Sequence, residues 1–113
     1  MKTPEIDKRL IKIAEYYGLA SQSNILQEEC AELIQAVSKY RRKSEPDVFD
    51  KMHIEEEIAD VEIMITQIKY LMKISNSDIK AIKDSKLERQ LERMKNESEE
   101  KDDTDDETEE DKT

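Results

Sequence analysis

The sequence has few of the residues that break helices, form disulfides or fill a large core. It contains one glycine, two prolines, one cysteine and no tryptophan, and aromatic residues make up 4% of its 113 residues. The lone Cys30 excludes an internal disulfide and fits a reducing cytoplasm. No apolar run approaches the ~20 residues of a bilayer-spanning helix, and no signal peptide is expected. The sequence therefore predicts a cytoplasmic protein with no membrane partner.

The negative charge is concentrated towards one end of the chain. Of a net charge of −10, residues 97–113 contribute eleven acids against two lysines and contain no apolar residue. Such a segment cannot offset the entropy cost of ordering, so we expect a disordered acidic tail at 97–113 after a helical domain at 1–96. A nearly neutral domain followed by an acidic tail is a poor match for nucleic acid, so no nucleic-acid partner is predicted.

The abundance of Glu, Lys, Ile and Leu predicts an all-α protein, and its length allows one domain with a modest core. Four helices are expected, with short connections that favour an antiparallel bundle. Apolar stripes on helices this long would remain uncovered in a monomer, so we expect at least a dimer. The expected helices run from a Thr3 cap and Pro4 to Gly18, from Ser21 or Ser23 to Lys43, from near Asp50 to the "SNSD" segment at 75–78, and from Ser77 through Met94.

Two of these helices carry the same acidic pattern beside an apolar seam. Glu29-x-x-Glu32 is followed, after 24 residues, by Glu57-x-x-Asp60. At about 100° per residue, each acidic pair borders its seam with the same phase. The seams are expected to pack the two helices together. They comprise Leu26, Cys30, Leu33, Val37 and Tyr40 in one helix, and Ile54, Ile58, Val61, Ile65, Ile68 and Met72 in the other.

If the two seams pack together, the four carboxylates converge. Like charges a few ångströms apart are unfavourable unless some protonate or a cation joins them. A site made of carboxylates, with no Cys/His cluster, suits Mg²⁺ or Mn²⁺ better than zinc. Because Mg²⁺ keeps several waters and usually meets phosphates, the pattern points to phosphate chemistry.

The paired motif resembles that of the MazG-like all-α nucleoside triphosphate pyrophosphohydrolases, which are related to dimeric dUTPases and phosphoribosyl-ATP pyrophosphohydrolase. The strings "EECAEL" and "EEIADVEIMITQI" look like MazG-type helices, and "KLERQLER" (86–93) is similar to the basic segment that follows them. The resemblance covers roughly Ile6 to Met94. It implies a four-helix MazG-like fold in a homodimer or homotetramer, and cleavage of a nucleoside triphosphate into its monophosphate and pyrophosphate.

By position, the resemblance implies roles for nine residues. Glu29, Glu32, Glu57 and Asp60 would hold Mg²⁺, with Mn²⁺ as the other possible ion. Glu28 or Glu56 would act as general base. Lys86, Arg89 and Arg93 would bind the phosphates. Apart from the resemblance, Gln22, Asn24 and Gln27 lie just ahead of or at the start of the first motif and are candidates to read base edges.

Two alternatives stay open at this point. One is a base-specific dUTPase or phosphoribosyl-ATP hydrolase, because nothing in the sequence fixes the base or sugar. The other is a helical interaction module without catalysis, in which the seams are docking surfaces and the acids are solvated. His53, the only histidine, is expected at the surface or in a cap just before its helix.

Overall fold

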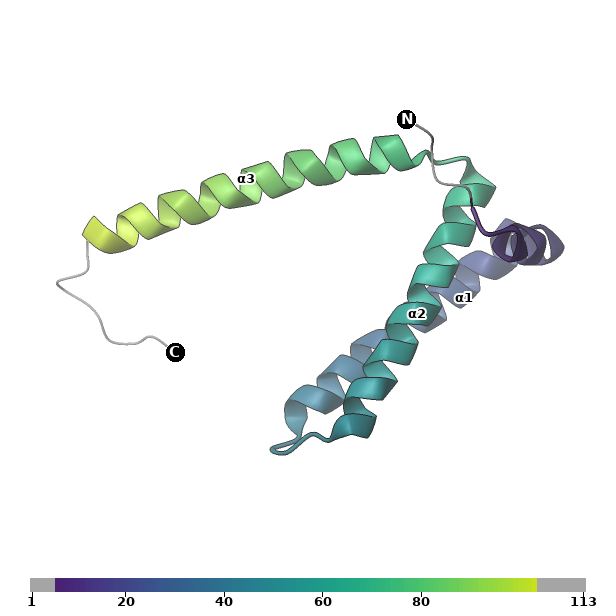
Figure 1. The fold of residues 1–113 in the computed structure, drawn as a ribbon, viewed down its shortest axis with the longest axis horizontal. Coiled ribbons are helices and arrows are strands. Elements are labelled where there is room, and N and C mark those ends of the chain that lie inside the picture. Colours follow the sequence, from purple (N-terminus) through teal and green to yellow (C-terminus); the bar gives the residue numbers. More distant parts are fainter. Residues whose placement is uncertain (1–5, 104–113) are drawn as a thin grey trace. The chain divides into compact units, whose positions relative to one another are not determined.

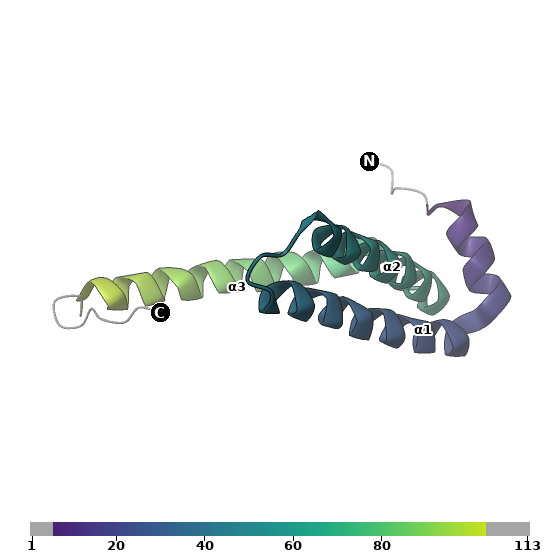
Figure 2. The same cartoon turned by 90° about the horizontal axis from the view of Figure 1, so that it is seen from below.

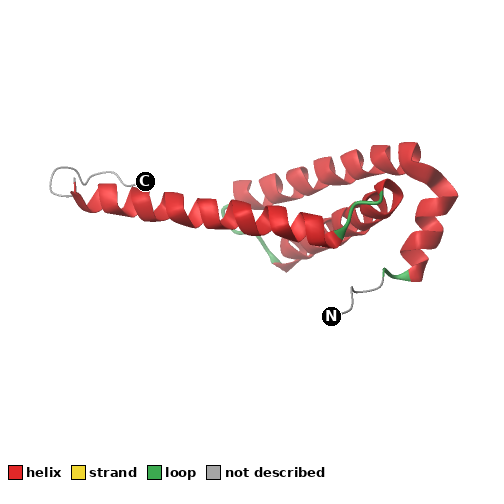
Figure 3. Cartoon of the chain, turned by 90° about the horizontal axis from the view of Figure 1, so that it is seen from above, coloured by secondary structure: helices red, strands yellow, loops and turns green. Residues whose placement is uncertain are grey.

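The computed structural model describes residues 6–103, and within them the chain is helical with no strand (Figures 1 and 3). The three helices are α1 (Lys8–Arg42), α2 (Val48–Met72) and α3 (Asn76–Asp103). The all-α class is confirmed, but three helices stand where four were expected. The chain divides after Ile74 into a first unit that contains α1 and α2 and a second that contains α3.

α1 begins later than the sequence indicated. Its N-cap is Asp7, whose carboxylate accepts the Arg9 backbone N–H at 2.9 Å and pairs with the Arg9 guanidinium at 2.6 Å. The Arg9 side chain holds the pKa of Asp7 at about 2, below its ordinary 3.8, so the cap stays ionised. The expected cap Thr3 and first-turn Pro4 lie outside the described residues.

Gly18 breaks α1 locally without ending it. Its backbone has φ 85° and ψ 170°, a region that L-residues with a side chain rarely adopt. The helix continues directly after this residue and turns in direction, as Figure 2 shows. The two helices expected on either side of Gly18 are therefore one element with an internal kink. No atom lies within 4 Å of a Cβ built at Gly18, so the constraint is conformational and not one of space.

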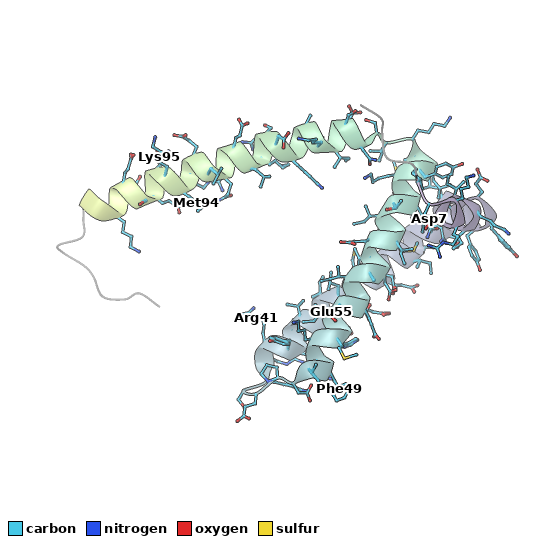
Figure 4. The ribbon with its side chains drawn as sticks, in the orientation of Figure 1. Asp7, Arg41, Phe49, Glu55, Met94 and Lys95 are labelled. Atoms are coloured by element: carbon cyan, nitrogen blue, oxygen red, sulfur yellow. The ribbon has the colours of Figure 1, made fainter. Side chains whose placement is uncertain are left out.

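Hydrogen bonds and an ion pair made by two aspartates stabilise the short turn between α1 and α2. Asp47 and Asp50 form a capping box at the start of α2, and Lys43 pairs with Asp50 at 2.8 Å. α2 thus starts two residues before the expected Asp50, and His53 lies inside the helix instead of before it. Figure 4 shows Arg41 and Phe49 flanking this turn. α2 ends at Lys73, which adopts a left-handed conformation with φ 57°.

α1 and α2 pack side by side in antiparallel directions (Figure 2). The expected seams form only part of this contact. Among seam residues Val61 is buried, whereas Val37, Ile58 and Ile65 are 38–43% exposed. The contact is rotated towards the acidic edge of each helix, because one neighbour covers only part of a wide apolar stripe and small alanines allow close approach. The buried residues are Ala14, Gln22 and Ala36 on α1, and Glu57, Val61, Met64 and Gln67 on α2.

Beyond the kink, the first turns of α1 contact the last turns of α2. The Tyr70 hydroxyl donates a hydrogen bond to the Glu15 carboxylate. Beside this bond is an open hollow of about 440 Å³, lined mainly by residues from the end of α2 and by Ile6. Glu15 precedes the acidic motif of α1, and Tyr70 follows the acidic motif of α2, so their contact is separate from the acidic residues.

α3 extends further than the expected last helix. Ser75, not Ser77, accepts the Asp78 backbone N–H, at 3.0 Å. The helix runs through residues 97–103, which sequence analysis assigned to the tail, because Glu and Lys are good helix formers and Lys101 in the last turn suits the helix dipole. Residues 104–113 of the expected tail lie outside the described residues. None of the three described helices has the length and apolarity needed to cross a membrane.

Candidate metal centre

The antiparallel contact brings acids from both motifs together. Glu29 on α1 and Glu57 and Asp60 on α2 each place a carboxylate oxygen within 4.8 Å of the others. Glu29 and Asp60 are half-buried, and Glu57 is 8% exposed. Three of the four expected ligands therefore meet in one cluster at the centre of the helix pair.

Glu57 is the innermost member of this acidic cluster. Its Oε2 lies 3.3 Å from Nε2 of His53, one helical turn earlier. Its Oε1 is buried and has no hydrogen-bond partner among the described residues. A buried carboxylate oxygen without a partner is costly, because it has lost water and gained nothing in exchange. This oxygen is therefore the strongest sign that the cluster accommodates a group from outside the chain.

The raised pKa of Glu29 is a second sign that the cluster accommodates a cation. Partial burial, followed by the charges of Asp60 and Glu32, raises the pKa of Glu29 from its ordinary 4.5 to about 7. A hydrogen bond with Asp60 and the charge of Glu57 add to the effect. At neutral pH the cluster thus shares a proton that relieves part of its repulsion. A divalent cation would relieve it more completely and would release that proton.

The donor set fits a hard divalent cation. All three members offer carboxylate oxygens, which suit Mg²⁺ and Mn²⁺, and the unpartnered Oε1 of Glu57 is a vacant donor of the same kind. Three protein ligands would leave coordination positions for water or phosphate oxygens, as Mg²⁺ usually requires.

The other expected site residues are not part of the cluster. Glu32 is exposed and acts on Glu29 through its charge alone. Glu28, Glu56 and Gln27 are exposed beside the ligands. Glu55 and Glu62 are also exposed, and Figure 4 shows Glu55 on α2.

The expected phosphate-binding residues lie on α3, in the second unit. Lys86, Arg89 and Arg93 have exposed side chains, and Arg93 donates a hydrogen bond to Gln90 at 3.3 Å. Lys86 and Arg89 border a shallow hollow on that helix, together with Ile82.

Two features were missed or misjudged from the sequence. His53 was expected at the surface or in a cap, and it is exposed, but its contact with Glu57 was missed although a spacing of four residues already put both side chains on one helix face. Gln22 was considered as a residue that reads a base, but it is buried and bonded to Gln67. No local signal marks Gln22 and Gln67 as a pair, because they lie 45 residues apart.

Comparisons with known proteins add no relative to this picture. No protein-family model, no curated protein and no solved structure matches the chain.

Proposed function

We propose that this protein is a Mg²⁺-dependent nucleoside triphosphate pyrophosphohydrolase of MazG-like type. The observation that carries the proposal is the buried, unpartnered Oε1 of Glu57 within a three-carboxylate cluster from two helices. The paired motif that resembles this family supplies exactly those three residues and Glu32. A cytoplasmic location, consistent with the free Cys30, is part of the proposal.

In this proposal the residues of the helix pair divide the work. Glu29, Glu57 and Asp60 would hold the cation, with Glu32 adding negative charge beside them. When bound, the cation would neutralise triphosphate charge and lower the pKa of a coordinated water. Glu28 or Glu56, exposed and each one residue before a ligand, would accept the proton of the attacking water. Attack of the water oxygen on one of the two phosphorus atoms of the α–β linkage would form one P–O bond as the bridging P–O bond breaks, and would give the nucleoside monophosphate and pyrophosphate.

Cations on the chain would contribute to substrate binding. Lys86, Arg89 and Arg93 are proposed to bind phosphate oxygens, and the exposed Gln27 to contact the base. A panel of nucleoside triphosphates would measure the selectivity for base and sugar. It would also distinguish a general enzyme from a dedicated dUTPase or phosphoribosyl-ATP hydrolase.

The exposed apolar stripe supports the oligomeric part of the proposal. Ile34, Val37, Ile58, Ile65 and Met72 are 38–66% exposed on the two packed helices. Two helix pairs that covered these residues against each other would make a four-helix bundle from two chains. A homodimer is the smallest such assembly, and a homotetramer would pair two of them.

The same stripe favours a second candidate function, an interaction module without catalysis. Phe49 and Val48, 71% and 61% exposed at the turn, are also available for a partner. This candidate predicts that Mg²⁺ has no effect on stability. The pyrophosphohydrolase predicts that Mg²⁺ raises the melting temperature, because the cation binds the folded state alone.

The deciding experiment incubates the full chain with a panel of nucleoside triphosphates, dUTP and phosphoribosyl-ATP included, with Mg²⁺, Mn²⁺ or EDTA. We expect cation-dependent release of pyrophosphate and monophosphate, without inorganic phosphate as the first product. Release of phosphate alone would contradict the cleavage position. An absence of turnover, combined with a melting temperature insensitive to both cations, would favour the interaction module.

A further inference from the structure

A second polar pair lies inside the contact between α1 and α2. Gln22 and Gln67 are 5% and 2% exposed, and Nε2 of Gln22 donates to Oε1 of Gln67 at 2.8 Å. Nε2 of Gln67 contacts the sulfur of Met64 at 3.6 Å, and Ser21 donates to Oε1 of Gln22 at 3.3 Å. One hydrogen bond thus joins the two amides across the helices, inside the buried contact.

The Gln22–Gln67 pair and the acidic cluster are separated by the same number of residues on both helices. Gln22 precedes Glu29 by seven residues, and Gln67 follows Asp60 by seven. Seven residues are about two helical turns, so both glutamines lie on the same faces as the acids, roughly 10 Å further along. In antiparallel helices, equal spacing on both sides means that Gln22 can meet Gln67 only in the register that places Glu29 opposite Asp60.

The acids themselves oppose this register. Without a cation, the shared proton relieves only part of the repulsion among Glu29, Glu57 and Asp60, and a slip of one turn would separate them. The buried apolar residues Ala14, Ala36, Val61 and Met64 make contacts that do not by themselves select one alignment of the helices. The turn at Lys43–Asp47 restrains one end of the pair, but the glutamines lie towards the other end. Towards that end, two directional bonds join the helices: the exposed Tyr70–Glu15 bond and the Gln22–Gln67 bond, of which the glutamine bond is the buried one.

We infer that the Gln22–Gln67 hydrogen bond is a positioning device that fixes the antiparallel register in which the three carboxylates meet. The inference rests on the proposed cation site for its functional meaning. A single buried polar pair can specify register at some cost in stability, because any other alignment leaves its amides unpaired. Gln22 and Gln67 would then act on the ligands without touching the cation.

The test replaces both glutamines with methionine, which has a similar unbranched shape and no amide. Spin labels at Ala20→Cys and Glu55→Cys, with Cys30→Ser, report the alignment along the helices in the absence of any cation. Q22M/Q67M is expected to keep its helical circular dichroism and its melting temperature, while the label distance shifts or broadens by about 5 Å, one helical turn. Q22L/Q67L repeats the measurement if the methionine pair does not fold. Gln35→Met, the same change at an exposed position, should leave the distance unchanged.

A second readout is Mn²⁺ affinity measured by calorimetry without labels. The doubly substituted protein should bind Mn²⁺ at least about tenfold more weakly at unchanged stability, the size of effect seen for residues that orient metal ligands. An unchanged label distance would overturn the register role, and a changed distance with unchanged affinity would overturn its link to the site. If the native protein binds Mn²⁺ but hydrolyses nothing, the proposed function fails while this inference stands. If it binds no cation, the link to the site fails as well, and the label distances decide the register role.

Discussion

The two copies of the acidic motif are alike in sequence and unlike in environment. On α2, Glu57 is buried and Asp60 half-buried, and both join the cluster. On α1, only Glu29 joins it, whereas Glu32 is exposed. The α2 copy therefore supplies the interior of the candidate centre, and the α1 copy supplies one ligand and a nearby charge.

This asymmetry follows from which residues face the partner helix. α2 buries four residues in or around its motif, Glu57, Val61, Met64 and Gln67, while α1 buries Gln22 and Ala36 on either side of its own. A repeated motif thus predicts which acids are candidates, and packing decides how deeply each one is placed. Substitutions at the buried Glu57, the half-buried Glu29 and the exposed Glu32 should therefore differ in their effects.

Glu57→Gln should have the largest effect. It replaces the buried unpartnered oxygen with an amide and should abolish the rise in melting temperature with Mn²⁺. Pyrophosphate release should fall by more than about 100-fold, since even residues behind a metal ligand are worth 10–100-fold. Differential scanning fluorimetry and a pyrophosphate assay would measure both effects. Glu55→Gln, an exposed neighbour on α2, is the matched control, and equal behaviour of the two variants would refute the assignment.

Glu29 should make stability depend on pH when cations are removed. Its pKa of about 7 in the folded state lies above its ordinary 4.5, so between these values the folded protein binds more protons than the unfolded chain. The stabilising contribution is complete below about pH 4.5 and is lost as pH rises through 7. Urea unfolding in EDTA should show this decline, and Glu29→Gln should flatten it. A decline of the same slope in the variant would place the shifted proton elsewhere.

Glu32→Gln should have the smallest effect among the motif acids. The side chain is exposed and outside the cluster, so water screens its charge. We expect less than about a tenfold loss of Mn²⁺ affinity and a modest lowering of the Glu29 pKa, since the Glu32 charge helps to raise it. Titration of Mn²⁺ by calorimetry, beside Glu57→Gln, gives the comparison. A loss as large as that of Glu57→Gln would mean that Glu32 binds the cation directly.

Periodicity predicted the helical class, the hairpin of α1 and α2 and three members of the cluster. It did not predict the exact contact face, because Val37, Ile58 and Ile65 fit a seam as well as the buried Val61 does. A 4–3 pattern shows that a helix has an apolar side, and small residues such as Ala36 decide how close the neighbour comes. Gly18 was correctly singled out, but a positive φ can kink a helix as well as end it.

The Gln22–Gln67 pair and the His53–Glu57 contact needed the structure for different reasons. Gln22 and Gln67 are far apart in sequence, and an isolated glutamine in a helix is usually a surface residue. His53 lies inside α2, and its spacing of four residues from Glu57 puts both side chains on one face of that helix.

The short turn between α1 and α2 also has a consequence for biosynthesis. Every acid of the paired motif lies between Glu29 and Asp60, within one hairpin closed by the Asp47 capping box. Contacts that are local in sequence form quickly, since little chain entropy is lost in closing a small loop. The carboxylates can therefore come together on the nascent chain once α2 has left the ribosome, before α3 has emerged.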